Sequence, residues 1–164
     1  MPCTPLTHIG IIVHDLEAAK ARFSEVLGIT FRENYQGRDA QFHGQGRTDS
    51  LDVEMAFSNE GPVFIELVQS QDNDSVYGSH LPEGVHHVAM FVPDTVSRLA
   101  ELEAAGIPTE YTISRPEPGA VPHAAYLDAT AVHGCRIELL NRLPHMFGYP
   151  EQAIVEEALG LPVA

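Results

Sequence analysis

Positively charged side chains are scarce in this sequence. Nine Lys and Arg residues stand against 23 Asp and Glu residues, which gives a formal net charge of −14 at neutral pH. Proteins that bind duplex nucleic acids or anionic lipid surfaces neutralise phosphate groups with clustered Lys and Arg side chains. The composition therefore argues against nucleic acids and membranes as partners. A small anionic substrate stays compatible with it, because a metal ion and one or two arginines can hold such a molecule locally.

Long hydrophobic runs are missing as well. The longest runs, such as residues 9–13, have the length of a strand. They fall far short of the roughly 18 residues that a membrane-spanning helix needs. No basic segment followed by an apolar stretch opens the sequence, so we expect no signal peptide.

Cysteine is rare too. The two cysteines, Cys3 and Cys135, form no CxxC pair. A disulfide between them stays open as an alternative, but the sequence has no framework of disulfides of the kind that marks a small secreted protein. A reducing compartment suits such a composition, and we therefore expect a cytoplasmic protein.

What the sequence does contain is an internal repeat. Residues 7–15 (THIGIIVHD) and 85–94 (VHHVAMFVPD) each carry a histidine, four mostly apolar residues, a valine and, two positions later, an aspartate. The matching histidines are His8 and His87, which lie 79 positions apart. A repeat of this kind decides the fold and has to be interpreted before any single motif.

A second pair of matching segments closes the two halves. FIELV at 64–68 and RIELL at 136–140 bring Glu66 and Glu138 to equivalent places. The chain thus contains two versions of one module. Each version opens with a histidine on a strand and closes with a glutamate on a strand.

The first half is predicted to begin with a buried strand and a helix, for which Asp15 is the N-cap and Gly28 the C-cap. Three further strands follow, and a polar, Gly-containing segment between them is expected to be a loop or a ragged hairpin. The predicted ranges are strands 7–13, 29–35, 51–58 and 63–69, helix 16–27, and loop or hairpin 36–50.

The second half is predicted to restart this order. Its helix begins after Asp94 and ends at Gly106, and a Pro-rich segment is too stiff to be a strand. The predicted ranges are strands 85–92, 107–113, 123–127 and 135–141, helix 95–105, and loop 114–122.

These elements predict one domain over residues 1–164. The expected parts are module one 6–70, linker 71–84, module two 85–141, and a C-terminal tail 142–164. The tail does not belong to the repeat. Its residues 151–159 have the spacing of a short helix with one apolar side, which is expected to cover an edge or a subunit interface.

The repeated histidines and glutamates have the pattern of metal ligands. Strand alternation places them among apolar neighbours on a face that is expected to be buried, and a buried carboxylate is costly unless it is paired or bound to a metal. For each residue alone, a satisfied core histidine or a solvent-facing glutamate is the simpler interpretation. The repeat instead favours one divalent ion, Zn, Ni, Co, Mn or Fe. Its predicted ligands are His8, Glu66, His87 and Glu138.

Taken together, the motifs resemble the vicinal oxygen chelate superfamily, which includes glyoxalase, methylmalonyl-CoA epimerase, bleomycin-resistance proteins and extradiol dioxygenases. The matching segments span residues 6–141 and read HIGIIVHDLEAAKARFSEVLGI, FIELV, GVHHVAMFVPD and YLDATAVHGCRIELL. The resemblance implies an α+β fold in which two βαβββ modules form a cupped, mostly antiparallel mixed sheet around a metal site. It implies the same four ligands, and it assigns His86 to the opposite face. A homodimer is implied as well.

Two features depart from the family pattern. Many members have Asp-Pro before the last strand, where this chain has Asp128-Ala129 and a longer connection through His133. The tail after Arg142 is longer than a minimal member needs. Both departures concern the substrate and leave the predicted fold unchanged.

The resemblance implies an enzyme whose divalent ion binds two neighbouring oxygens of a small molecule. Four candidate ligands favour a metal-dependent isomerase or lyase of the glyoxalase or methylmalonyl-CoA epimerase type, which acts on a small carbonyl or thioester substrate through a metal-stabilised enolate. In this interpretation Glu66 and Glu138 are catalytic, and Glu66 both binds the ion and takes the substrate proton. Glu54 is another candidate base by analogy with the epimerases, although an exposed strand glutamate is the simpler interpretation.

Two alternatives stay open. In a non-haem Fe(II) extradiol-type dioxygenase, two histidines and one carboxylate hold the iron, and His123 and Tyr126 would bind the substrate. A strand-edge histidine and a core tyrosine are the simpler interpretation of these two residues. A non-catalytic ligand-binding protein of the bleomycin-resistance type is the other alternative, and the complete ligand set argues against it. Several arginines are candidates for an anionic group of the substrate, although eight arginines against one lysine equally fit a compositional bias. These are Arg32, Arg38, Arg47 and Arg115.

Overall fold

The computed structural model describes residues 6–141, apart from 38–39, 62 and 73–74. The first half contains β1 (Leu6–Ile12), α1 (Leu16–Leu27), β2 (Tyr35–Gln36), β3 (Ala40–Gly44), β4 (Arg47–Leu51), β5 (Val53–Phe57) and β6 (Phe64–Ser70). The second half contains β7 (Gly84–Phe91), α2 (Thr95–Ala104), β8 (Thr109–Ser114), β9 (Ala124–Leu127), a 3₁₀ turn η1 (Ala129–Val132) and β10 (Ile137–Leu140). The predicted tail helix, the tail itself and Cys3 lie outside the described residues, and Cys135 is an exposed free thiol.

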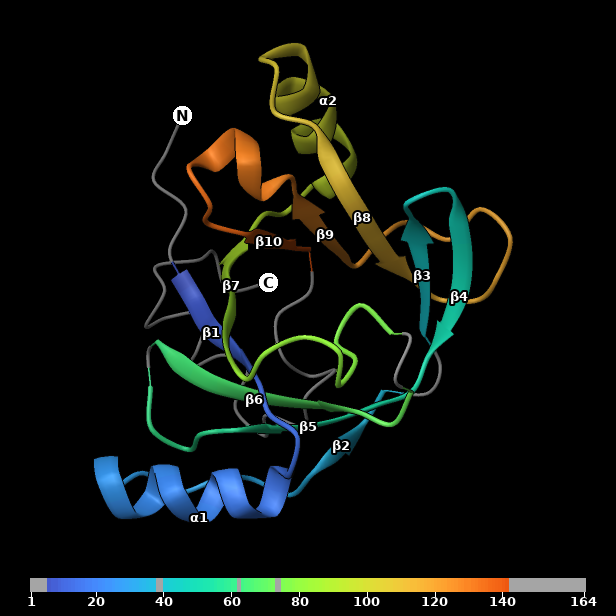
Figure 1. The fold of residues 1–164 in the computed structure, drawn as a ribbon. Coiled ribbons are helices and arrows are strands. Elements are labelled where there is room, and N and C mark those ends of the chain that lie inside the picture. Colours follow the sequence, from blue (N-terminus) through green and yellow to red (C-terminus); the bar gives the residue numbers. More distant parts are fainter. Residues whose placement is uncertain (1–5, 38–39, 62, 73–74, 142–164) are drawn as a thin grey trace.

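The strands form one curled sheet in the order β2-β5-β6-β1-β7-β10-β9-β8-β3-β4 (Figure 1). The order β2-β5-β6-β1 in the first half is mirrored by β7-β10-β9-β8 in the second half. The halves meet edge to edge, because β1 pairs antiparallel with β7. Parallel pairing occurs between β1 and β6 and between β7 and β10. The predicted α+β fold, with two βαβββ modules in a cupped and mostly antiparallel sheet, is confirmed.

The two helices cover the outside of the cup. Asp15 caps α1 by accepting a hydrogen bond from the Ala18 backbone N–H at 2.9 Å, and Asp94 caps α2 in the same way from Ser97 at 3.0 Å. Both caps were predicted from the sequence. Helix α1 packs on β5 and β6, and α2 packs on the second half (Figure 1). Neither helix has the length and hydrophobicity that crossing a membrane requires.

One part of the sheet differs from the prediction. The predicted strand over 29–35 is wrong, because only Phe31 makes a bridge there, to Ser58, before the short β2. The polar segment after it forms the hairpin β3–β4, which leaves the first half and pairs with β8 of the second. Its turn residues Gln45 and Gly46 both have positive φ, 52° and 74°, which is the geometry of a tight two-residue hairpin.

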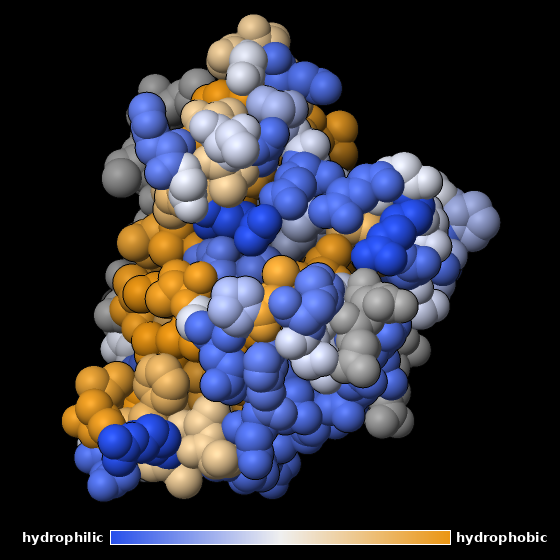
Figure 2. Space-filling view, viewed as in Figure 1, coloured by the Kyte–Doolittle hydropathy of each residue, from blue (hydrophilic) through white to orange (hydrophobic). Residues whose placement is uncertain are grey.

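Apolar side chains fill the inside of the cup. The buried cluster there draws on both halves and on the linker, and it consists of Ile12, Phe42, Leu51, Val53, Val68, Tyr77, Ala89, Tyr111, Ile113, Ala124, Tyr126 and Leu140. On the surface, Figure 2 shows hydrophilic residues over the β3–β4 hairpin, whereas hydrophobic residues gather on the opposite side, over β1 and the beginning of β6.

Candidate metal centre

Four buried side chains from four neighbouring strands meet inside the cup. Glu66 lies on β6, His8 on β1, His87 on β7 and Glu138 on β10. Nε2 of His8 is 3.3 Å from Oε2 of Glu66 and 3.1 Å from Oε2 of Glu138. Nε2 of His87 is 3.2 and 3.3 Å from the same two oxygens, and the two Nε2 atoms are 3.2 Å apart. The structure thus brings together all four predicted ligands.

The strand register explains why the four side chains converge. Cross-strand pairing places them in two rows, each with a small residue at its centre. One row is Glu66, Gly10 and His87, and the other is His8, Ala89 and Glu138. Each small residue follows a ligand histidine by two positions, so that it occupies the same face. A Cβ on Gly10 would lie 1.9 Å from Cε1 of His87. The absence of a side chain at Gly10 is therefore what lets the His87 imidazole lie against the backbone of β1.

A bulge precedes each of the two histidines. The register between β1 and β7 shifts at Thr7 and again at His86, which leaves both residues without a cross-strand partner. Bulges re-aim side chains and are frequent next to active sites. The prediction that His86 points to the opposite face is consequently wrong. Its ring lies inside the cup, with its centroid 5.1 Å from that of Tyr77.

Each bulged residue contacts the Nδ1 atom of the histidine that follows it, on the side of the imidazole that faces away from the centre. Oγ1 of Thr7 lies 3.2 Å from Nδ1 of His8, and Nδ1 of His86 lies 3.0 Å from Nδ1 of His87. Burial, followed by the charge of His87, lowers the pKa of His86 to about 3, so His86 is neutral and can accept a hydrogen bond. A partner at Nδ1 leaves Nε2 of each ligand histidine directed at the centre, as in imidazoles that bind metals.

Without an ion, the four groups hold one another in charged forms. Burial lowers the pKa of His8, but the Glu66 and Glu138 carboxylates outweigh burial and raise it from 6.5 to about 10. The pKa of His87 is raised in the same way, mainly by Glu138. Burial raises the pKa of the two carboxyls, and the imidazoles outweigh it, so that the pKa of each carboxyl falls below its usual range. A divalent ion can replace the two imidazole protons without changing the net charge of the centre.

The donor set fits such an ion. Oε2 of Glu138 is buried and makes no hydrogen bond with any described residue, although two imidazole nitrogens lie 3.1 and 3.3 Å away. Ligand atoms at about 2.1 Å from one ion are themselves spaced by roughly 3 Å. His8, His87 and Glu138 each offer one ligand atom, and these three atoms all lie within 4.8 Å of one another. Glu66 joins this group through its contacts with both histidines.

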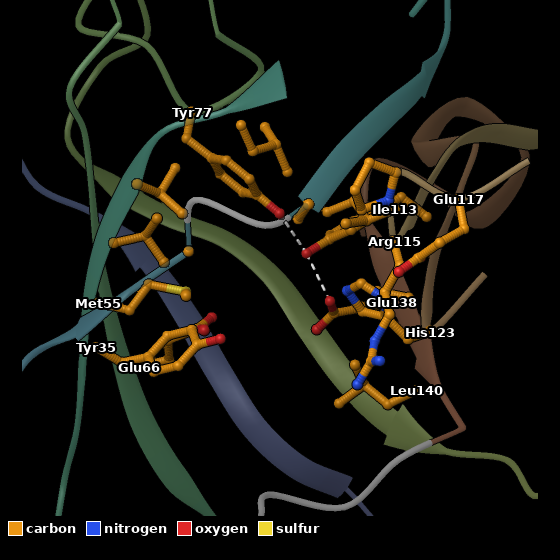
Figure 3. Close-up of a pocket in the computed structure, with 18 residues that line it drawn as sticks. Tyr35, Met55, Glu66, Tyr77, Ile113, Arg115, Glu117, His123, Glu138 and Leu140 are labelled. Atoms are coloured by element: carbon orange, nitrogen blue, oxygen red, sulfur yellow. Dashed lines mark hydrogen bonds between the residues drawn. The ribbon is translucent and has the colours of Figure 1, made fainter. Parts of the chain in front are cut away.

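The Glu138 carboxylate is held by a chain of phenols. The Tyr126 hydroxyl donates a hydrogen bond to Oε1 of Glu138 at 2.6 Å, and the Tyr77 hydroxyl lies 2.5 Å from that of Tyr126 (Figure 3). Burial raises the pKa of both phenols well above its usual value, which keeps them protonated. The chain therefore reaches from the linker between the modules to one of the four candidate ligands.

Glu66 has no equivalent support from the described residues. Phe57 is its cross-strand neighbour, just as Tyr126 is the neighbour of Glu138. The Phe57 ring packs edge-on against His8 at 5.4 Å between centroids, and the Tyr126 ring packs against His87 at 5.3 Å. Phe57 lacks a hydroxyl, so the two halves match in packing but differ in how firmly each carboxylate is held.

The two carboxylates form part of the wall of a cavity of about 670 Å³. Its two sides come from the two halves, as Figure 3 shows: Tyr35, Met55 and Glu66 on one side, and Ile113, Arg115, His123, Glu138 and Leu140 on the other. His123 and Tyr126, which were predicted to bind a substrate, both line this cavity. A volume of this size is typical of small-molecule sites.

Glu54 lies elsewhere. On β5 its neighbours Val53 and Met55 line the cavity, and strand alternation turns Glu54 to the other face. There it accepts a hydrogen bond from Nδ2 of Asn34 at 2.9 Å. This position is incompatible with the role of catalytic base that the sequence suggested for Glu54.

Three contributors to the centre were missed in the sequence. A glycine inside a strand marks a close approach of another group, and Gly10 carries this signal. Phe57 stands out only once it is compared with Tyr126 across the repeat. Tyr77 lies in a linker without periodicity, and no pattern in the sequence connects it to Glu138.

Comparisons with known proteins agree with the fold. The crystal structure of methylmalonyl-CoA epimerase from Mycobacterium tuberculosis matches with a TM-score of 0.64 and 23% identity, over 90% of this chain and 97% of that chain. A hypothetical protein from Bacillus halodurans C-125 matches with a TM-score of 0.64 and 20% identity, over 87% and 96%. A variant of the Streptomyces coelicolor epimerase, in complex with 2-nitronate-propionyl-CoA, matches with a TM-score of 0.60 and 22% identity, over 85% and 94%.

A search of curated proteins gives no match. Residues 7–127, a range that contains His8, His87 and Glu66, match the model of one family. The chain belongs to the glyoxalase/bleomycin resistance protein/dioxygenase superfamily.

Proposed function

We propose that this protein is a metal-dependent isomerase or lyase of the glyoxalase or methylmalonyl-CoA epimerase type. It acts on a small carbonyl or thioester substrate through an enolate. The observation that carries the proposal is the convergence of two imidazoles and two carboxylates beside a substrate-sized cavity, with each Nε2 atom 3.1–3.3 Å from an oxygen of both carboxylates. Structural neighbours crystallised with methylmalonyl-CoA or 2-nitronate-propionyl-CoA support a thioester among the candidates.

His8, His87, Glu138 and Glu66 would hold one ion of Zn, Ni, Co, Mn or Fe. Such an ion supplies a Lewis acid beside the substrate oxygens and lowers the free energy of negative charge that develops on them. Apolar side chains such as Met55, Ile113 and Leu140 line the cavity, and a bound substrate that displaces water from this wall would strengthen electrostatic interactions inside it.

Glu66 is the residue that we assign to proton transfer. It faces the cavity, and no phenol of the described residues donates a hydrogen bond to it, so it can turn toward a substrate carbon next to a carbonyl and take its proton. Glu138 is held by Tyr126 and stays in place as a ligand. Return of the proton from Glu66 to another atom on the same face of the enolate would give an isomerisation.

A second candidate is the Fe(II) extradiol-type dioxygenase. The tight group of His8, His87 and Glu138 is a set of two histidines and one carboxylate, as in non-haem iron oxygenases. His123 and Tyr126 line the cavity beside it. In this candidate Glu66 would have no role in proton removal.

Hydrogen exchange at carbon separates these candidates. The purified protein, with its metal content measured, is incubated in D₂O with methylmalonyl-CoA, propionyl-CoA and the hemithioacetal of methylglyoxal, and deuterium incorporation next to the carbonyl is followed by NMR. We expect incorporation that stops on chelation and returns with added metal. No incorporation across the panel by metal-loaded protein contradicts the proposal, and oxygen uptake with catechols would then favour the dioxygenase. Absence of both deuterium incorporation and oxygen uptake would favour the third alternative, a non-catalytic ligand-binding protein.

The remaining assignments are proposals too. We propose a homodimer, and the hydrophobic residues that gather over β1 and the beginning of β6 offer a surface for it (Figure 2). Sedimentation of the purified protein tests this. A location in the cytoplasm and a small-molecule partner follow from the composition and from the size of the cavity.

A further inference from the structure

Arg115 is the single Lys or Arg among the described residues that line the cavity. It follows β8 directly, and Figure 3 shows it on the wall that the second half forms, with His123 and Glu138. The other cavity residues with full charges are acidic, namely Glu66, Glu138 and Glu117. Arg115 is therefore the one described side chain of the cavity whose full positive charge can attract an anionic group of a ligand.

Arg115 also differs from most of the basic residues in its pairing. Five basic side chains of the described chain form ion pairs with nearby carboxylates: Lys20, Arg22, Arg47, Arg98 and Arg136. Arg115 forms none with a described residue, even though acidic residues outnumber basic ones by 23 to 9 and Glu117 is only two positions away. Its guanidinium therefore remains available to a ligand in the cavity.

Two hydrogen bonds hold the backbone around Arg115, which begins the loop after β8. The Ser114 hydroxyl donates a hydrogen bond to the Arg115 carbonyl at 2.9 Å, and the His123 backbone N–H donates to the Ile113 carbonyl at 2.9 Å, which closes the loop after β8. Pro116 follows at once and restricts φ of that loop. A side chain on a fixed backbone loses less entropy when it binds an anion.

We propose that the substrate carries an anionic group, a carboxylate or a phosphate, on an arm separate from its carbonyl, and that Arg115 binds this group. The inference rests on the proposed function for the carbonyl end of the molecule. Guanidinium binds carboxylate and phosphate with two parallel hydrogen bonds. Met55, Ile113 and Leu140 line the cavity and suit a hydrocarbon spacer between the two ends. Without Arg115, the three glutamates that line the cavity would repel an anionic ligand.

Calorimetric titration of the purified protein with matched pairs of ligands tests the proposal. The pairs are 4-oxopentanoate and its methyl ester, 6-oxoheptanoate and its methyl ester, and dihydroxyacetone phosphate and dihydroxyacetone. Arg115→Gln removes the charge, and Arg115→Lys keeps it. Arg22→Gln, on the exposed side of α1, is the control for loss of one positive charge. Glu117→Gln removes one negative charge from the cavity.

We expect Arg115→Gln to weaken binding of the anionic member of at least one pair about 10- to 100-fold. The affinity for the neutral member of that pair should change less than twofold. Arg115→Lys should bind the anion more tightly than Arg115→Gln does, and Glu117→Gln should bind it more tightly than the unaltered protein. Equal effects on both members of every pair, or no effect, overturn the proposal, provided that metal content is unchanged. Failure of the proposed function has a different signature: no deuterium incorporation, with the dependence of anion binding on Arg115 intact.

Discussion

The two halves of this molecule build the same half-site and then complete it differently. In both, a bulged residue supports a histidine, a small residue follows two positions later, and an aromatic ring packs edge-on against the imidazole. In the second half that ring is Tyr126, which donates a hydrogen bond to Glu138, whereas the first half has Phe57 beside Glu66. The repeat explains how one ion can be shared. The Tyr126 hydroxyl, which Phe57 lacks, explains how two similar carboxylates can take different roles.

The largest effect is expected from Glu66→Gln. It should lower deuterium incorporation about 10²- to 10⁴-fold, the usual contribution of a general base, while metal content stays close to normal. Glu138→Gln should instead reduce metal content, because it alters the carboxylate that Tyr126 holds. Glu54→Gln, on the other face of the sheet, is the control. If the two cavity variants lose metal and activity in parallel, the proposed division of roles is wrong.

Exchanging the two aromatic residues sharpens the comparison. Tyr126→Phe gives the second half the chemistry of the first and should weaken metal binding about 10- to 100-fold, as loss of a residue that supports a ligand does. Phe57→Tyr places a hydroxyl near Glu66 and should lower turnover more than metal affinity. Tyr77→Phe should have a smaller effect, because Tyr77 reaches Glu138 only through Tyr126. Metal titration with a competing chelator measures the metal affinity of all three variants, and deuterium incorporation measures their turnover. Equal affinities and equal turnover would contradict the proposed difference between the two carboxylates.

Gly10→Ala tests the packing of the two rows. The new Cβ would overlap the His87 ring, and overpacking of this kind costs about 1–3 kcal/mol of the free energy of unfolding. Ala89→Gly, at the equivalent position of the second half, creates no overlap and should cost about 0.5–1 kcal/mol. Urea denaturation in the presence of chelator measures both. A larger loss for Ala89→Gly than for Gly10→Ala would contradict the description of the rows.

The smallest expected effect is on pH dependence. The pKa of His8 is raised from 6.5 to about 10 in the metal-free centre, so its contribution to stability is complete below pH 6.5 and is lost as the pH rises through 10. Metal-free protein should therefore become less stable over this range. Metal affinity should increase over the same range, because fewer protons have to be displaced. Titrations at three pH values with unchanged affinity would show that His8 is not a ligand.

Much of the fold and the convergence of the four side chains could be predicted because both depend on local patterns that occur twice. His8 and His87, and likewise Glu66 and Glu138, have matching apolar neighbours, and Asp15 and Asp94 mark both helix starts by the same capping chemistry. The hairpin β3–β4 was predicted less well, since β4 is mostly polar and exposed and its place in the sheet depends on pairing with a distant strand.

The errors at the centre have different causes. The orientation of His86 was predicted from regular strand alternation, which a bulge interrupts. Glu54 was assigned by analogy, and alternation along β5 turns it away from the cavity. Tyr77 is brought to Tyr126 by the course of the linker, a tertiary contact across 49 positions without a local signal.

The shared ion is tested most directly by anomalous diffraction from crystals of the protein loaded with zinc. We predict one peak per chain, about 2.0–2.2 Å from a ligand atom of His8, His87 and Glu138, with Glu66 on the same ion before substrate binds. A peak bound by residues of one half alone, or no peak between β1 and β7 in protein that carries zinc, would contradict the claim that both halves hold a single ion.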